Sequence, residues 1–348
     1  MDLFDVVATI VKVALVVGIL ISTVPVLTWV ERRGSAFIQL RLGPNRVGPL
    51  GLLQPLADGI KFLFKEDVIP PHVYKLFYVA APAVSFIAAV LAFAVIPFGS
   101  AFVVDGRTVP LVILDVDVGV LFLLAASGMG VFGIILAGWS SNNKYSMLGG
   151  LRSSAQMISY ELSLGLAIVS VLIYAGTLRP VEIVQQQIGG TWNVFPLFIG
   201  FLILLVSAFA ETNRLPFDLP EAETELVAGY HTEYSSMKFS MFFMAEYINM
   251  ITGSALVTTL FLGGYALPFQ RLVFEGWLGL EGNLLAVLEL LSFTAKVGFF
   301  LWLFVWVRWT LPRFRFDQLM RLGWKVLIPL ALVHVVWASL LVMWGVPA

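Results

Sequence analysis

Long apolar segments alternate with short polar ones along nearly the whole chain. A helix that crosses a bilayer needs about 20 mainly apolar residues, and eight segments come close to that length. They are residues 6–30, 77–98, 118–139, 156–175, 194–210, 239–262, 284–307 and 326–344. The pattern predicts an all-α, polytopic membrane protein with about eight transmembrane helices. Because no repeat or linker divides it, residues 1–348 are expected to form a single integral membrane domain.

The polar segment after the first apolar one is long and has two parts. Residues 41–49 (RLGPNRVGP) are rich in turn residues that break a helix. Beyond them, one helical face carries the polar residues Gln54, Asp58, Lys61 and Lys65. The apolar surface is supplied by Leu52, Leu53, Leu56, Ile60, Leu63 and Phe64. This pattern predicts an amphipathic helix lying at the membrane interface. An ordinary surface helix is the alternative.

Composition supports a membrane protein and excludes several other classes. Hydrophobic residues make up 59% of the 348, charged residues 12%, and the mean hydropathy is +0.92, whereas soluble proteins contain about 25% charged residues. The net charge of −1 gives no overall attraction to nucleic acid. Asp2 and Asp5 open the chain without a basic region or cleavage site, so the first apolar segment is interpreted as a transmembrane helix and not a signal peptide.

The sequence lacks the usual residues for holding cofactors. With no cysteine, the chain can form no disulfide and hold no iron–sulfur cluster through its own thiolates. His72, His231 and His334 lie far apart, without metal-ligand spacing. No phosphate-binding glycine loop follows a strand pattern. We therefore expect no metal and no other cofactor bound by this chain.

Lysine and arginine predict the orientation. The segments after the first, third, fifth and seventh apolar segments carry 16 of these residues, and the alternate segments carry only Arg107, Arg179 and Arg271. By the positive-inside rule, the first set lies in the cytoplasm and both termini lie outside.

Carboxylates gather in residues 210–234, between two predicted spans. They include Glu211, Asp218, Glu221, Glu223 and Glu225, beside a single arginine, Arg214. Clustered like charges next to hydrocarbon are costly, and ionisable groups at membrane level are usually functional. Helix capping, with Asp218 as N-cap and Glu221 completing a capping box, is a structural alternative. It leaves the other three glutamates unexplained, except as a solvated acidic loop.

A few charges fall within or at the ends of the predicted spans. Glu161 lies about 8 Å and Glu246 about 12 Å from the cytoplasmic ends of their helices, at 1.5 Å per residue, and Glu211 ends the span between them. These three carboxylates are predicted to lead inward from the acidic segment. Glu289 and Lys296 lie seven residues apart on nearly one face. The alternative for all of them is pairing that holds helices together.

The last inside segment interleaves arginines with aromatic residues. Residues 308–320 read RWTLPRFRFDQLM. Such a segment either anchors the chain at the membrane interface or binds an amphipathic ligand with a polar head and an apolar tail.

Six motifs carry a resemblance to a known family. They are residues 31–33 (ERR), 39–49 (QLRLGPNRVGP), 51–59 (GLLQPLADG), 210–219 with AETNR and PFDL, 243–247 (FMAEY) and 312–320 (PRFRFDQLM). Together they closely resemble the H-subunit family of the bacterial proton-pumping NADH:quinone oxidoreductase, complex I. The resemblance covers essentially the whole chain.

The resemblance implies a membrane subunit of the bacterial inner membrane that works with other complex I subunits, with the lipid bilayer and with a quinone such as ubiquinone as substrate. FMN and iron–sulfur clusters would be held by partner subunits, and nucleic acid is not an expected partner. The quinone passage would be formed by Glu31, Arg32, Arg41, Asp58, Arg214, Phe217, Asp218 and Arg313. The proton path would be formed by Glu161, Glu211, Glu221, Glu223, Glu225 and Glu246.

Other functions fit the same features. A membrane subunit of an energy-converting hydrogenase resembles this chain but has no quinone role. An independent proton or ion transporter also needs buried carboxylates and a midspan lysine. A scaffold that only anchors soluble subunits would tolerate loss of the buried glutamates.

Overall fold

The computed structural model describes residues 3–345 except 105, 220–222, 278 and 280–281. Within these residues the regular secondary structure is helical apart from one short hairpin. The helices are α1 (Leu3–Ile38), α2 (Gln54–Phe64), α3 (Lys75–Phe93), α4 (Gly119–Ser140), α5 (Lys144–Ala175), α6 (Pro180–Gly189), α7 (Phe198–Glu211), α8 (Glu223–Leu226), α9 (Ser236–Phe261), α10 (Asn283–Thr310), α11 (Phe316–Leu322) and α12 (Ile328–Met343). Four short 3₁₀ or π segments are η1 (Pro49–Gly51), η2 (Gly229–His231), η3 (Gln270–Trp277) and η4 (Gly323–Leu327). The all-α class is confirmed.

Each predicted span overlaps one of these helices. Among the described residues, six helices are long and apolar enough to cross a membrane: α1, α3, α4, α5, α10 and the continuous stretch Phe316–Met343. The other two predicted spans correspond to α7, which has 14 residues, and to α9, which has 26. The α-helix of α7 begins at Phe198, later than predicted. A count of eight crossings stays a prediction.

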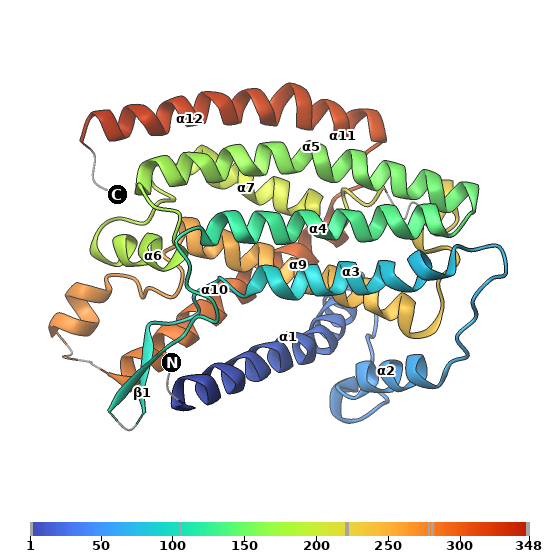
Figure 1. Cartoon of the computed structure of the whole chain (residues 1–348), viewed down its shortest axis with the longest axis horizontal. Helices are drawn as coiled ribbons and strands as arrows, with labels where there is room; N and C mark the ends of the chain where they lie inside the picture. Colours follow the sequence, from blue (N-terminus) through green and yellow to red (C-terminus); the bar gives the residue numbers. More distant parts are fainter. Residues whose placement is uncertain (1–2, 105, 220–222, 278, 280–281, 346–348) are drawn as a thin grey trace.

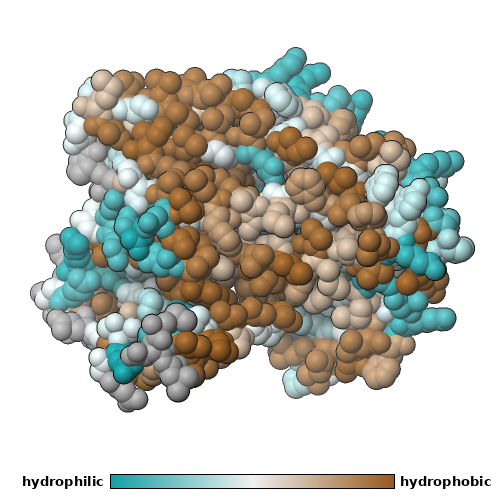
Figure 2. Space-filling model, viewed as in Figure 1, coloured by the Kyte–Doolittle hydropathy of each residue, from teal (hydrophilic) through white to brown (hydrophobic). Residues whose placement is uncertain are grey.

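The long helices run side by side along the molecule (Figure 1). The start of α1 and the end of α12 lie at one end, with α6 and the hairpin. At the other end lie α2, the α4–α5 turn and the segment between α7 and α9. Figure 2 shows a broad hydrophobic belt between hydrophilic ends. The arginine-rich segments thus share one end of the bundle, as the alternation of spans requires.

The first helix is longer than its apolar pattern. α1 has 36 residues, or about 54 Å at 1.5 Å per residue, against about 30 Å of bilayer hydrocarbon. Its last turns therefore carry Glu31, Arg32 and Arg33 beyond the apolar stretch on a rigid helix. It ends where Leu40 takes a positive φ of 53° ahead of Pro44.

The amphipathic helix predicted after the turn-rich segment is α2. Its side chains Leu56, Leu63 and Phe64 are 60%, 63% and 86% exposed in the isolated chain, and it packs against α1 and α9. Such an uncovered apolar face suits the membrane interface, and the interfacial placement stays a prediction.

The hairpin was not anticipated by the sequence. Strands β1 (Ala101–Val104) and β2 (Arg107–Pro110) pair antiparallel, with Ala101 opposite Pro110. Asn283 at the start of α10 fixes the hairpin, because its side chain exchanges two hydrogen bonds with Val103, of 2.7 and 2.9 Å.

Small residues allow the central helices to approach closely. A Cβ at Gly133 of α4 would overlap the Ser85 hydroxyl of α3, and one at Gly138 would lie 2.7 Å from the Ser146 carbonyl of α5. Helix contacts in membranes rely on such packing because hydrophobic burial gives no advantage there.

The sidedness of the fold is testable with single cysteines, since the chain has none of its own. Lys65, Lys144 and Thr108 are exposed. In vesicles, an impermeant thiol reagent should modify Lys65→Cys and Lys144→Cys from one side and Thr108→Cys from the other. Modification of Lys65→Cys and Thr108→Cys from the same side would contradict the arrangement.

Candidate functional site

A cluster of ion pairs forms around Glu31, near the end of α1. Glu31 is 6% exposed and receives two hydrogen bonds from Arg214 Nη1, each 3.1 Å long. The Tyr247 hydroxyl donates to its carboxylate at 2.6 Å, and Arg308 pairs with it from α10. The carboxylate thus joins α1, α9, α10 and the segment that follows α7.

Arg214 connects this cluster to a second carboxylate. It is 4% exposed, pairs with Glu246 of α9 through Nε and lies over the Tyr247 ring at 4.3 Å from its centroid. Burial by itself would lower the pKa of Arg214, but the carboxylates of Glu246 and Glu31 raise it well above its usual range. The guanidinium therefore stays charged, and the two carboxylates share its charge.

Asp218 and Arg313 form a neighbouring pair. Arg313 Nη2 lies 2.8 Å from Asp218 Oδ2, and Phe217 packs between Tyr160 and Phe314, with centroid distances of 5.6 and 5.4 Å. This pairing joins the acidic segment to the arginine-rich segment after α10.

Helix capping was the structural alternative for Asp218. In the structure this side chain pairs with Arg313, which lies 95 positions away. Residues 220–222, among them the capping-box residue Glu221, lie outside the described residues, so the cap stays an untested alternative.

A third group of charges links α1 to α2. Arg32 Nη1 lies 2.6 Å from Asp58 Oδ2, Lys61 Nζ lies 3.7 Å from its other oxygen, and Gln54 donates to it at 3.2 Å. Arg41, beyond the end of α1, donates to Gln39 at 2.6 Å. The polar face of α2 thus meets the charged end of α1.

Some of these residues line one cavity of about 510 Å³ between α1, α2, α9 and α10. Four residues predicted for the quinone passage contribute to it: Glu31, Arg32, Arg41 and Asp58. The other walls are mainly apolar, with Phe62, Phe243 and Met244 among them. The other four residues predicted for the passage do not line this cavity: Arg214, Phe217, Asp218 and Arg313. Arg214 is connected to the cavity through its hydrogen bonds to Glu31, which does line it.

Three side chains of this site were missed by the sequence reasoning. Tyr247 and Arg308 both hold Glu31, and His231 packs edge-on against Phe239 and Phe243, which line the cavity. Burial lowers the pKa of His231 to about 4, so it is neutral near pH 7. The FMAEY motif contains Tyr247 and the arginine-rich segment at 308–320 contains Arg308, but no local signal marks His231.

The predicted proton-path residues fall into two groups. Glu211 and Glu246 both line a small internal cavity of about 30 Å³, which has room for water. Glu161 is close enough to Glu211 for their charges to repel, and its Oε1 is buried without a hydrogen bond. Glu225 instead lies at the surface, paired with Arg152 at 2.5 Å. Glu221 and the Glu223 side chain lie outside the described part of the chain.

Glu289 and Lys296 do not pair with each other. Lys296 Nζ donates to the carbonyls of Leu262, Gly264 and Ala266 at 2.7, 3.0 and 2.6 Å. Glu289 accepts hydrogen bonds from Ser100 N at 2.9 Å and from the Gln270 side chain at 2.8 Å. Both residues therefore fasten connecting segments to α10.

Comparison with known proteins gives consistent matches over most of the chain. The family model described as NADH dehydrogenase matches residues 11–339. NADH-quinone oxidoreductase subunit 8 of Rhodothermus marinus is 53% identical, with 94% of each chain covered. The H 1 subunit of NADH-quinone oxidoreductase from Solibacter usitatus is 48% identical, with 99% of each chain covered. The H subunit from Salinibacter ruber is 52% identical, with 94% of this chain and 93% of the relative covered.

Removing Arg214 should destabilise the protein strongly. Arg214→Met leaves Glu246 buried without its cation, a loss that costs roughly 3–5 kcal/mol in buried ion pairs. We expect a lower thermal midpoint for the purified assembly, and partial recovery in Arg214→Met with Glu246→Gln, since Glu31 keeps Arg308 and Tyr247.

Arg315→Met is the control, because its pair with Asp317 is largely exposed and such pairs contribute about 0–1 kcal/mol. Equal midpoints for Arg214→Met and Arg315→Met would show that the buried cluster contributes nothing.

Proposed function

Because this chain belongs to the NADH dehydrogenase family, as a membrane subunit of NADH-quinone oxidoreductase (complex I), we propose that its cavity admits quinone and that its buried carboxylates couple quinone reduction to proton movement. The cavity between α1, α2, α9 and α10 carries this proposal, since one space brings Glu31, Arg32, Arg41 and Asp58 together with side chains of α9 and α10 that lie far away in the sequence.

The cavity walls match the two chemical parts of a quinone. Arginine side chains supply donors for carbonyl oxygens of the head group, and Phe62, Phe243 and Met244 give an apolar surface for an isoprenoid tail. α2 presents apolar side chains outward beside the cavity, which is where a ligand dissolved in the bilayer would enter. Arg313, Asp218 and Phe217 would continue the passage toward partner subunits.

An electrostatic connection runs from the cavity into the bundle. Glu31 lines the cavity and shares Arg214 with Glu246, and Glu246 shares an internal cavity with Glu211. Glu161 lies next along this line. A charge arriving on quinone would change how strongly Glu31 binds Arg214, and therefore how strongly Arg214 stabilises ionised Glu246. Protons would redistribute among the three inner carboxylates as a coupled set.

Quinone reduction also needs electrons, which would come from partner subunits that carry FMN and iron–sulfur clusters. These soluble-arm subunits would bind at the end that carries α2 and the 212–235 segment. The excess of arginine and lysine at that end supports a cytoplasmic placement in the bacterial inner membrane, with both termini on the outer side. Glu221, Glu223 and Glu225 would form the entrance of the acidic path.

The transporter alternative depended partly on Lys296 as a midspan charge. Its three bonds to backbone carbonyls give that lysine a structural role, and no described contact favours independent transport.

Filling the cavity should impair the use of quinone. Gly59 lines it, and a Cβ there meets no atom within 4 Å, so Gly59→Leu adds bulk inside the cavity without disturbing the helix. Overfilling a site costs roughly 1–3 kcal/mol, and we expect kcat/KM for quinone to fall roughly tenfold or more. Labelling near Arg32 by a photoreactive quinone should fall in parallel.

Gly165→Leu is the matched control, because its Cβ is equally free and it does not line the cavity. If Gly59→Leu kept wild-type kinetics, or if the photoreactive quinone labelled partner subunits alone, the passage would lie elsewhere.

Replacing the inner carboxylates by groups that cannot titrate should impair both quinone reduction and proton pumping. Glu161→Gln, Glu211→Gln and Glu246→Gln keep size and hydrogen bonding, so the complex should assemble. A positioned proton-transfer group contributes roughly 100-fold or more, and quinone reduction and proton pumping in vesicles should fall together.

Glu182→Gln serves as a control at the opposite end of the bundle, where Glu182 pairs with Arg179. Wild-type reduction and full pumping in all three inner variants would make these carboxylates structural.

A further inference from the structure

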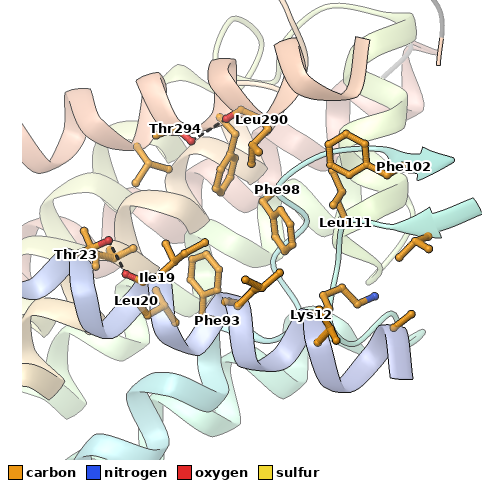
Figure 3. A pocket seen from close by; sticks show the side chains of 18 of the residues that line it. Lys12, Ile19, Leu20, Thr23, Phe93, Phe98, Phe102, Leu111, Leu290 and Thr294 are labelled. Atoms are coloured by element: carbon orange, nitrogen blue, oxygen red, sulfur yellow. Dashed lines mark hydrogen bonds between the residues drawn. The ribbon is translucent and has the colours of Figure 1, made fainter. Parts of the chain in front are cut away.

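A second cavity, of about 780 Å³, follows α1 on another face (Figure 3). Its walls come from α1, α10, the end of α3 and the hairpin with the residues on either side of it, with Phe93, Phe98 and Leu111 among them. Nearly every side chain that lines it is apolar. The two threonines satisfy their hydroxyls within their own helices, Thr23 to Ile19 O at 2.7 Å and Thr294 to Leu290 O at 2.8 Å. Hydrocarbon therefore suits this space, and a polar ligand does not.

This cavity is separate from the one proposed for quinone. On α1 it is lined by residues from Phe4 to Thr23, whereas the quinone cavity is lined by residues from Ile21 onward. At 3.6 residues per turn, the two sets lie on roughly opposite faces of the helix. α1 thus stands between them.

The length of the cavity suits an acyl chain. From Phe4 to Thr23 it follows α1 for about 28 Å at 1.5 Å per residue. One leaflet supplies about half of the roughly 30 Å of bilayer hydrocarbon, so a flexible hydrocarbon chain that enters from the hairpin end fits within this length.

Two cations mark the end of the cavity near the hairpin. Lys12 Nζ reaches toward the hairpin and donates to Pro110 O at 3.0 Å, and the Arg107 guanidinium lies 5.0 Å from the centroid of Phe4. Asp5 is the one acidic residue among the described positions of the first turns of α1. Lysine and arginine beside hydrocarbon extend their charges toward the head-group layer, where phosphate is the anion available.

We propose that this cavity binds an anionic phospholipid from the leaflet that faces the hairpin. One acyl chain lies between α1 and α10, and the phosphate lies at Lys12 and Arg107. The bound lipid fills the space between two helices that also frame the quinone cavity, without entering that cavity. The site requires only that the chain spans a bilayer, so it does not depend on the proposed quinone passage.

The acyl-chain part is tested on the purified, intact complex. Phosphatidylglycerol with a diazirine in one acyl chain is exchanged in and photolysed, and labelled peptides are identified by mass spectrometry. Labelling should concentrate on residues 4–23 and 290–301 and exceed that of the exposed face of α12. Uniform labelling of all outward-facing helices, or a crosslink showing another subunit in the cavity, would overturn the proposal.

A pair of glycine variants controls for lipid contact in general. Gly298 lines the cavity and Gly18 does not, and a Cβ at either one meets no atom within 4 Å. Gly298→Leu should reduce labelling of both peptides at least fivefold, while Gly18→Leu leaves it unchanged. Quinone reductase activity verifies that both variants assemble. Equal labelling in the two variants would mean that lipid covers the surface without entering the cavity.

The head-group part is tested by charge. Lys12→Gln and Arg107→Gln should each reduce labelling by the phosphatidylglycerol probe several-fold and should change labelling by a phosphatidylcholine probe little. Equal labelling by the two probes in the unsubstituted complex would show that the site does not select an anionic lipid.

Discussion

A charge buried in a membrane protein must have a partner, because leaving it unpaired costs several kcal/mol. Here Glu31 and Glu246 share the buried Arg214, with Arg308 and Tyr247 completing the set. The cluster ties α1, α9 and α10 to the segment after α7, so it fixes where the charged end of α1 lies. That position in turn sets the wall of the cavity against α2 and the orientation of Arg32 toward Asp58. Much of the candidate site therefore depends on satisfying these few charges.

The same cluster gives a physical basis for coupling over distance. One arginine between two carboxylates cannot stabilise both fully. A change in the charge near Glu31, which lines the cavity, therefore alters how strongly Arg214 stabilises Glu246. Glu246 then faces a small space shared with Glu211, and Glu161 lies within electrostatic reach of Glu211. No large movement is needed, because the interaction acts through charges already in contact in an interior of low dielectric.

Two cavities of different chemistry follow different faces of α1. The one near its charged end combines arginines and carboxylates with apolar walls, and the one along its apolar part has little but hydrocarbon. Lys296 and Glu289, which looked like candidates for transport, instead hold connecting segments to α10. Charged side chains at membrane depth thus stabilise the fold in the half of the molecule near the hairpin. In the half near α2 they lie in or beside the candidate site.

The sequence by itself determined the helical class, the approximate spans, the turn-rich break after α1 and the helix at Gln54–Phe64, because hydropathy and helix breaking act over short distances. It also marked the residues of the family motifs. It could not determine which charges meet: Arg214 and Glu31 are 183 positions apart, and Arg308 and Glu31 are 277 apart. It offered a local cap as one alternative for Asp218 and could not show that Arg313 binds that side chain from another segment. Such pairings depend on how each helix is rotated and how deeply it is inserted, and only the packed structure sets those two quantities.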